Sequence, residues 1–484
     1  MGAINGTQFI ERINRLNANI WLNGRKLAGR ISEHPAFKGI LQSKAELYDL
    51  QHDPTLKNKL TYTDLDTGEV MGLSFLQPKT YEDLVKRRTM MELWARHTHG
   101  MMGRSPDYMN SVLMAFASSA AILVGRKGCF PEHIQALYKR AKENDLSFTH
   151  TFITPQTNRG QLAIPFSEKK PISARVIERT EKGLIITGAR LLATQGGLTD
   201  EVLVYTGGGI FHESEAYAFS IPTNTRGLKF ICRESFISSD SAFNSPLGSR
   251  YEEMDTILVF EEVLVPWECV FFYDNLEAAN DFMVQGCFHH FATHQAVTRQ
   301  IIKTEFVLGL AGLLVETINV GGYQHIQEKL AEIIVGLETM KSLILKAEIE
   351  AETDDYGILR PNLRSLQAAT IIFPRIYPRF SEIIQLIGAS GMVTLPTEED
   401  FQSGIREDLD QYLQASCRTA EERVKIFRLA WDLTMSSFGT RQTQYERYFF
   451  GDPVRLSSLL YKSYPVSDNM KQVTNFLDID CLPE

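Results

Sequence analysis

The 484-residue sequence predicts an α+β, mainly α, fold in which a helical region, a β-rich region and a helical bundle follow one another. Near both ends of the chain, apolar residues recur at the spacing of amphipathic helices. Between these regions, short alternating runs separated by turn residues predict antiparallel strands. We therefore expect an N-terminal helical domain over residues 1–150, a middle β-barrel domain over 151–275 and a C-terminal helical bundle with a tail over 276–484.

The β-rich region opens with a hairpin signature. In "ARVIERTEKGLIITGARLLAT", residues 174–194, two alternating runs are joined by Glu-Lys-Gly. Four further short runs with strand-like composition follow: "EVLVYT", "AYAFSIP", "GLKFIC" and "TILVFEEVLVP". Their close spacing predicts a mostly antiparallel barrel or sandwich.

The period returns to that of a helix after about residue 288. Gly321–Gly322 predicts a break, and Thr419 opens a later helix with a capping box. We expect Pro374 and Pro378 to kink a helix that ends near Gly388. One apolar stripe predicts a long amphipathic helix in a bundle: Ile326, Leu330, Ile333, Leu337, Met340 and Ile344. No GxGxxG follows a strand, which disfavours the doubly wound nucleotide-binding folds.

Composition restricts the classes of partner. The formal net charge of -9 argues against nucleic acid or an anionic membrane as a partner. No apolar run approaches the length of a membrane span, and charges interrupt the N-terminus where a signal peptide would be apolar. The six cysteines are scattered singly, without the paired spacing of zinc or disulfide frameworks. We therefore expect a cytoplasmic protein.

The stretch "HGMMGRSPDYMN", residues 99–110, predicts a sharp helix start. Ser105 has the character of an N-cap, Pro106 of a first helical residue, and Asp107 complements the positive helix end. Arg104 and Tyr108 can then reach one point near that end, which suits a phenolate, a carboxylate or a peroxide-like oxygen. A surface arginine packed on a tyrosine ring would have the same spacing.

Histidines mark two other candidate sites. His150 lies at the expected boundary between the helical and β regions, directly before the polar run Gln156–Arg159, which suits a ligand cleft but also a purely structural role. His289, His290 and His294 lie near a cysteine but lack a carboxylate or second cysteine at ligand spacing. We therefore expect no metal site there.

Six stretches follow one another along nearly the whole chain: "GRSPDY", "THTFITPQTNR", "GARLLAT", "FEEVLVPWE", "GASGMVTLPTEEDF" and "FGTRQTQYERYFFGDP". Together, and in this order, they resemble the oxygenase components of the FADH2-using, two-component 4-hydroxyphenylacetate 3-monooxygenase family, which includes phenol and chlorophenol hydroxylases. The resemblance implies an acyl-CoA dehydrogenase-like fold and FAD delivered as FADH2 by a separate NAD(P)H-flavin reductase. It also implies molecular oxygen as co-substrate, a phenol as substrate, and a homotetramer or homodimer.

The resemblance also implies roles for individual residues. Arg104, Tyr108 and His150 match the catalytic residues around the phenolic oxygen, and Thr206 and Gly207 lie where the family holds the substrate's tail. The run Thr206–Gly208 lacks the expected pair of hydroxyl residues, so the sequence leaves the choice among phenols open. The family's flavin contacts map onto His150, Thr151, Phe152, Gln156, Thr157, Asn158, Arg159, Thr194, Arg441, Tyr445, Arg447, Tyr448 and Gly451.

The implied reaction is ortho-hydroxylation of the phenol to a catechol by a flavin C4a-hydroperoxide, with His150 as base and Arg104 and Tyr108 as donors to the phenolic oxygen. Three alternatives remain: a 4-hydroxybutyryl-CoA dehydratase-like enzyme, an acyl-CoA dehydrogenase-like enzyme and an inactive helical scaffold. The dehydratase would need cluster-binding cysteines in the region of Arg104 and Tyr108, and this region has none.

Overall fold

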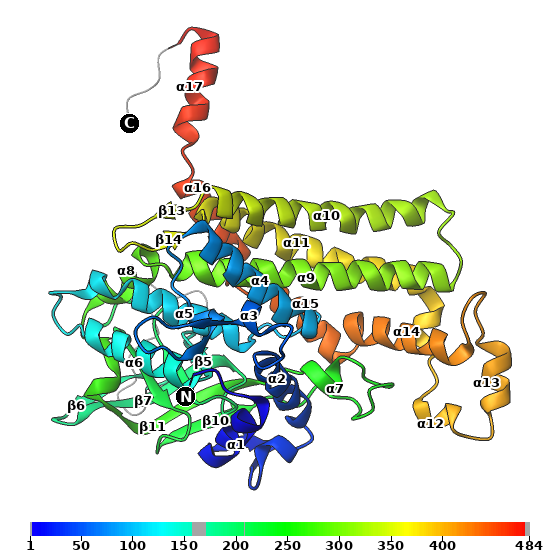
Figure 1. The fold of residues 1–484 in the computed structure, drawn as a ribbon, viewed down its shortest axis with the longest axis horizontal. Helices are drawn as coiled ribbons and strands as arrows, with labels where there is room; N and C mark the ends of the chain where they lie inside the picture. The colour runs from blue at the N-terminus through cyan, green and yellow to red at the C-terminus, as the bar shows by residue number, and fades with distance from the viewer. Residues whose placement is uncertain (1, 157–170, 208, 480–484) are drawn as a thin grey trace.

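The computed structural model describes residues 2–156, 171–207 and 209–479 (Figure 1). Helices dominate its first third, as the apolar spacing predicts. Their bounds are α1 Gly6–Leu16, α2 Lys38–Leu50, α3 Lys57–Leu60, α4 Tyr81–His97, α5 Pro106–Ser118 and α6 Pro131–Asn144. Four short strands that were not expected lie among them: β1 Ile20–Leu22, β2 Arg25–Lys26, β3 Thr61–Thr63 and β4 Val70–Gly72.

The middle of the chain forms two sheets. Its elements are β5 Phe148–Thr151, β6 Arg175–Arg179, β7 Gly183–Thr194, β8 Glu201–Val204, β9 Tyr217–Pro222, β10 Leu228–Cys232, the short helix α7 Gly248–Tyr251, β11 Asp255–Pro266 and β12 Val270–Tyr273. The expected β6–β7 hairpin is present, and the four further runs are strands.

These strands do not close into one barrel among the residues described. One sheet has the order β2-β1-β10-β11-β7-β6 and the other the order β12-β9-β8-β5, so the expected barrel is corrected to two packed sheets. Apolar side chains from β7 and β11 share a core with those from β8 and β9. Two pairings are parallel, β1 with β10 and β5 with β8.

The C-terminal part is a helical bundle, in which α9, α10 and α11 run side by side (Figure 1). The α9–α10 break falls at Gly321–Gly322, and α11 continues through Pro374 and Pro378 to Gly388. Thr419 caps α14 in a capping box as predicted. Bounds in this part are α8 Leu276–Gln285, α9 Phe288–Thr317, α10 Gln324–Ile349, β13 Glu352–Thr353, β14 Leu359–Arg360, α11 Leu363–Gly388, α12 Glu398–Phe401, α13 Arg406–Tyr412, α14 Ala420–Thr434, α15 Ser437–Tyr448, α16 Pro453–Ser463 and α17 Val466–Leu477.

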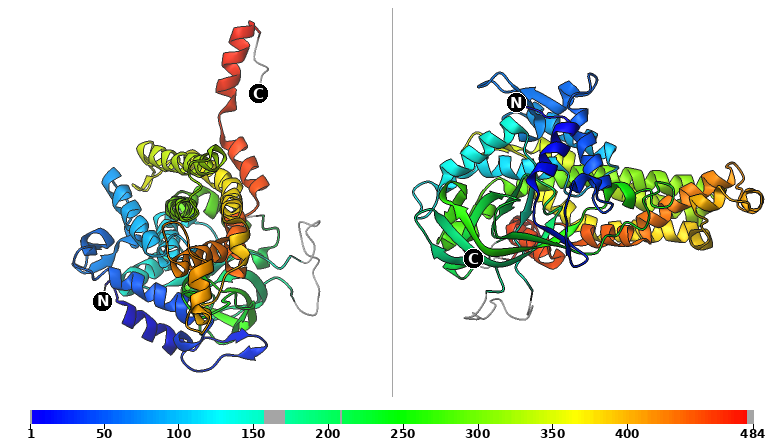
Figure 2. Two further views of the ribbon diagram at one scale, coloured as in Figure 1. Left: turned by 90° about the vertical axis from the view of Figure 1, so that its right-hand side faces the viewer. Right: turned by 90° about the horizontal axis from the view of Figure 1, so that it is seen from below.

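The bundle extends away from the β region, and α17 projects from the body of the molecule (Figures 1 and 2). Helix α5 packs on α9 and also contacts β5, so it lies where the helical and β parts meet. No helix among the described residues is long and apolar enough to cross a membrane. The contact region around α5, β5 and α15 contains the predicted catalytic residues.

Candidate active site

Arg104 and Tyr108 lie on the two sides of the start of α5. Pro106 is the first residue of this helix, and Ser105 is at the N-cap position as predicted. The Ser105 hydroxyl does not cap the helix, however, because it donates to the Asp107 carboxylate at 2.5 Å. Burial favours this contact, since Asp107 is 1% exposed and needs donors within the protein.

The Arg104 guanidinium is held by aromatic rings. Its central carbon lies 4.2 Å from the ring centroid of Tyr108, 4.1 Å from that of Phe449 and 5.4 Å from that of Tyr445. The buried Nε and Nη1 atoms have no hydrogen-bond partner among the residues described. Such a guanidinium has donors available for an oxygen atom that the described residues do not supply.

His150 lies on β5, beside the same ring system. Its imidazole lies 5.9 Å from the Tyr108 ring and is nearly parallel to the rings of Phe152 and Tyr205, with interplanar angles of 4° and 14°. Burial, assisted by the positive charge of Arg104, lowers the pKa of His150 well below its usual value. The imidazole is therefore neutral at neutral pH and can accept a proton. Arg104 and His150, which were identified from two separate stretches of the sequence, thus lie in one site.

Burial raises the pKa of the Tyr108 phenol, although the nearby Arg104 opposes this effect. Tyr108 therefore remains protonated and can donate a hydrogen bond. The site combines a neutral base, a neutral donor and a cation at the positive end of α5, which together suit an oxygen atom that loses a proton.

The residues predicted to contact flavin around β5 have different positions. The Phe152 ring lies nearly parallel to the His150 imidazole, and Gln156 is exposed. The Thr151 hydroxyl donates to the Leu191 carbonyl at 2.7 Å, and the Thr194 hydroxyl donates to Asp255 at 2.9 Å. Both hydroxyls are thus engaged within the protein. Thr157, Asn158 and Arg159 lie outside the described residues.

The other predicted flavin contacts lie on or directly after α15, and only some of them face Arg104. Arg441 and Tyr445 lie one turn apart on the face toward Arg104, and the Arg441 guanidinium lies 4.0 Å from the Tyr445 ring centroid. Arg447 and Tyr448 are exposed. Gly451 follows the helix with a φ of 99°, in the region that favours glycine. Of the predicted flavin contacts on or after α15, only Arg441 and Tyr445 lie in the aromatic cluster around Arg104.

The predicted substrate-tail residues follow β8. Thr206 is buried, and its hydroxyl donates to the Ala279 carbonyl at 2.6 Å. A β-carbon on Gly207 would lie 3.1 Å from the Phe152 ring, so this glycine allows the close approach of backbone and ring. Neither residue presents a free hydroxyl group to a ligand.

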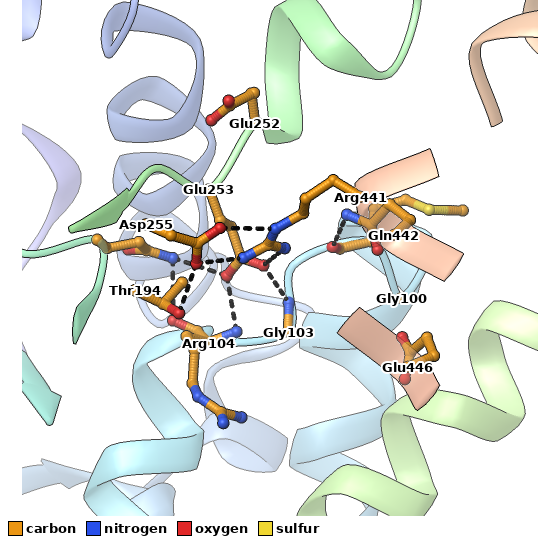
Figure 3. A network of polar contacts seen from close by, with 12 residues as sticks. Gly100, Gly103, Arg104, Thr194, Glu252, Glu253, Asp255, Arg441, Gln442 and Glu446 are labelled. Atoms are coloured by element: carbon orange, nitrogen blue, oxygen red, sulfur yellow. Dashed lines mark hydrogen bonds and ion pairs between the residues drawn. The ribbon is translucent and has the colours of Figure 1, made fainter. Parts of the chain in front are cut away.

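The sequence did not reveal the acidic residues that lie next to the site. Asp255 is the first residue of β11 and Glu253 shortly precedes it, and Arg441 pairs with Asp255 at 2.7 Å (Figure 3). Burial opposes ionisation, but Arg441 and Arg233 lower the pKa of Asp255 to about 2. The run "EEMD" before a strand is a detectable signal, because carboxylates there need buried partners.

Comparisons with known proteins bear on the whole chain. Residues 5–272 match the family model "4-hydroxyphenylacetate 3-hydroxylase N terminal", and residues 279–478 match "4-hydroxyphenylacetate 3-hydroxylase C terminal". The chain belongs to the 4-hydroxyphenylacetate 3-hydroxylase family. A probable 4-hydroxyphenylacetate 3-monooxygenase of Bacillus subtilis (strain 168) is 65% identical, with 99% of each chain covered. The oxygenase component of 4-hydroxyphenylacetate 3-monooxygenase of Thermus thermophilus is 44% identical and covers 98% of this chain and 97% of its own.

Solved structures of this family have the same fold. An oxygenase component of 4-hydroxyphenylacetate 3-monooxygenase, complexed with FAD and 4-hydroxyphenylacetate, matches with a TM-score of 0.93, 43% identity and 98% of each chain covered. An archaeal 4-hydroxybutyryl-CoA dehydratase shares the fold with a TM-score of 0.89 at 18% identity, covering 100% of this chain and 96% of its own. The expected acyl-CoA dehydrogenase-like fold is thereby confirmed.

Proposed function

We propose that the protein is the oxygenase component of a two-component flavin-dependent monooxygenase. It hydroxylates 4-hydroxyphenylacetate, or a related para-substituted phenol, ortho to the hydroxyl group. The observation that carries this proposal is the half-buried Arg104 side chain, whose buried Nε and Nη1 atoms have no partner among the described residues and which lies beside Tyr108 and His150. A buried cation without a partner is costly, and a phenolic oxygen that becomes anionic would offset this cost.

The residues present fit a flavin. Tyr205 and Tyr445 each have a buried hydroxyl group without a partner in the described part of the chain. The rings of His150, Phe152 and Tyr205 lie nearly parallel to one another, with interplanar angles of 4° to 17°. A flat ring system with carbonyl and nitrogen acceptors suits both features. When bound, the reduced flavin supplies the two electrons that reduce one oxygen atom of O2 to water while the other enters the phenol ring.

The protein residues act on the phenol. The neutral His150 imidazole accepts the phenolic proton, which makes the ring more electron-rich at the ortho carbon. Arg104 and Tyr108 donate hydrogen bonds to the phenolic oxygen, and the positive end of α5 stabilises its negative charge. Tyr108 and His150 are at most 5% exposed, so the site excludes water that would divert the oxidation to hydrogen peroxide.

A second candidate substrate class is a phenol without a carboxylate. The Thr206 hydroxyl is already used by the Ala279 carbonyl, and Gly207 has no side chain, so neither offers a hydroxyl donor to a carboxylate tail. Relative turnover of 4-hydroxyphenylacetate and 4-ethylphenol distinguishes the two classes. A much higher kcat/KM for 4-ethylphenol would favour the uncharged substrate.

We also infer that a separate NAD(P)H-flavin reductase supplies FADH2, that the enzyme acts in the cytoplasm and that copies of the chain associate as a tetramer or dimer. The five described cysteines are free thiols, which suits a reducing compartment. Helix α17 projects from the body and buries none of its residues (Figure 1). One side of it carries exposed apolar residues, which suit contact with another copy: Met470, Val473, Phe476 and Leu477.

Sedimentation analysis of Phe476→Asp tests this association. We expect wild type to sediment as a multiple of 54.8 kDa and the variant as a smaller species. Lys471→Ser on the same helix is the matched control and should leave the mass unchanged. An unchanged mass for Phe476→Asp, or a monomeric wild type, would remove α17 from assembly.

Isotope labelling tests the proposed activity. The purified protein is supplied with FAD, a flavin reductase, NADH, ¹⁸O2 and 4-hydroxyphenylacetate or 4-ethylphenol. We expect a catechol that carries one labelled oxygen atom, and no label when only the water is labelled. Flavin oxidation that yields hydrogen peroxide and no catechol from either phenol would contradict the proposal.

A further inference from the structure

The peptide groups of Gly103 and Arg104 are held by a single buried carboxylate from a distant part of the chain. The Arg104 N–H donates to Glu253 Oε1 at 2.7 Å, and the Gly103 N–H donates to Glu253 Oε2 at 2.8 Å (Figure 3). The Glu253 side chain is fully buried. A buried carboxylate with several donors is strongly stabilised in one position, and so is the backbone that supplies those donors.

Gln195 completes this arrangement from the neighbouring strand. Its side-chain Nε2 donates to the Arg104 carbonyl oxygen at 3.1 Å and to Glu253 Oε1 at 2.8 Å. Gln195 directly follows β7 and Glu253 shortly precedes β11, and these two strands are antiparallel partners. The φ of Gln195 is 60°, in the left-handed region that few residues with a side chain adopt. The adjacent ends of these two strands thus place both side chains against the Arg104 backbone.

Arg441 and Tyr445 support the same loop from the other side. Arg441 Nη1 lies 3.4 Å from Glu253 Oε2, while its other nitrogens pair with Asp255. Gly103 packs against Tyr445 so closely that a β-carbon would lie 2.3 Å from the ring. The main chain before Arg104 therefore has little freedom to move.

The Arg104 side chain points away from the carboxylate that holds its backbone. In Figure 3 its guanidinium points away from the carboxylates. It lies against the rings of Tyr108 and Phe449. Because its Nε and Nη1 have no hydrogen-bond partner in the described residues, ring contacts and the backbone position determine where its donors lie. A shift of the backbone would move those donors relative to the phenolic oxygen.

We propose that Glu253 is a positioning residue for phenol recognition, which acts with Gln195 through the Arg104 peptide to aim the guanidinium at the phenolic oxygen. This inference rests on the proposed function. The neighbouring Glu252 has no such role, because its carboxylate binds the Arg233 guanidinium at 2.5 Å and the Phe236 N–H at 3.0 Å. Glu252 points away from the loop in Figure 3, which makes it a matched control.

The test measures discrimination between a phenol and its deoxy analogue. Equilibrium binding of 4-hydroxyphenylacetate and of phenylacetate is followed by difference absorbance with FAD present, for wild type, Glu253→Gln and Glu252→Gln. In Glu253→Gln one acceptor oxygen is replaced by a donor that opposes a backbone N–H. We expect the preference for the phenol to fall about tenfold in this variant, because an aligned hydrogen bond is lost, and to stay unchanged in Glu252→Gln. General damage to the site would weaken both ligands equally.

Two further variants keep the test decisive if Glu253→Gln folds poorly. Gln195→Asn tolerates the positive φ but is too short to reach the Arg104 carbonyl, so it should show a smaller loss of the same preference. In the Arg104→Ala background, Glu253→Gln should have almost no further effect, because both act through one guanidinium.

Full additivity of the two changes, or an unchanged phenol preference in both Glu253→Gln and Gln195→Asn, would overturn the positioning role. A wild-type protein that does not distinguish the phenol from phenylacetate would contradict the proposed recognition of the phenol itself, and the positioning role with it.

Discussion

The guanidinium of Arg104 stacks on the ring of Phe449, with its central carbon 4.1 Å from the ring centroid. Tyr108 lies at a similar distance, so the cation is enclosed by rings that attract it but do not neutralise it. Other buried arginines have oxygen acceptors within the protein: Arg299 pairs with the Glu446 carboxylate, whereas Arg87 and Arg190 donate to carbonyl and hydroxyl oxygens. Arg104 can thus donate a hydrogen bond to an oxygen atom of a bound ligand, and the surrounding residues determine the chemistry at that atom.

The substitution His150→Phe should separate the chemical role of this residue from its packing role. The introduced phenyl ring can still stack on Phe152 and Tyr205, as the imidazole does, but it cannot accept a proton. We expect catechol formation to fall at least about tenfold while flavin oxidation continues and releases hydrogen peroxide. The ratio of catechol to peroxide measures this directly. A ratio equal to that of wild type would exclude His150 as the base.

The pH dependence of hydroxylation follows from the lowered pKa of His150. An imidazole acts as a base only when neutral, and burial keeps His150 neutral to well below the ordinary histidine pKa of about 6.5. We therefore expect no loss of kcat/KM from His150 between about pH 8 and pH 6, and a loss only at lower pH. A profile that falls with a midpoint at or above the ordinary histidine value would contradict this environment.

Arg104→Lys keeps the positive charge but removes the flat guanidinium that fits between Tyr108 and Phe449. We expect the Kd for 4-hydroxyphenylacetate to rise about tenfold or more, because a charge-assisted hydrogen bond is lost or misdirected. Isothermal titration calorimetry would measure it, and binding of phenylacetate should change little. Equal losses for both ligands would indicate that Arg104 serves packing alone.

Glu446 should be important for folding rather than for phenol recognition. Its buried carboxylate binds Arg299 at 2.6 Å and Lys303 at 2.8 Å, which ties α15 to α9. Glu446→Gln leaves two buried cations without a counter-charge, so we expect a loss of about 3–5 kcal/mol in the free energy of unfolding. Glu350→Gln, which breaks the exposed Lys346–Glu350 pair, should cost less than about 1 kcal/mol. Urea denaturation would compare them, and similar losses would contradict this assignment.

Much of the architecture was predictable because burial patterns are local. The β6–β7 hairpin and the α10 stripe follow from the alternation of apolar residues and from their helical spacing, respectively. The pairing of β1 with β10 was not predictable, since three residues carry little periodicity and their partner lies about 200 residues away. A barrel was expected because strand spacing alone does not show whether the outer strands pair.

The site was predictable in part. The predicted helix start put Arg104 just before α5 and Tyr108 in its first turn, so both side chains were expected near one point at the helix end. Glu253 was missed because it binds Arg104 across 149 positions of sequence, and a carboxylate before a strand is compatible with many partners. The positions of Arg447 and Tyr448 show the reverse problem, since they follow Arg441 and Tyr445 closely but lie on the exposed side of α15.

A single-turnover reaction tests the central claim most directly. The protein is mixed anaerobically with FADH2 and 4-hydroxyphenylacetate, or with 4-ethylphenol, and then exposed to oxygen while flavin oxidation and catechol are measured. We predict that the protein changes the rate of flavin oxidation relative to free flavin and that one of these phenols yields close to one catechol per flavin. Oxidation at the rate of free flavin, with peroxide and no catechol, would contradict the claim that this buried site couples reduced flavin to phenol hydroxylation.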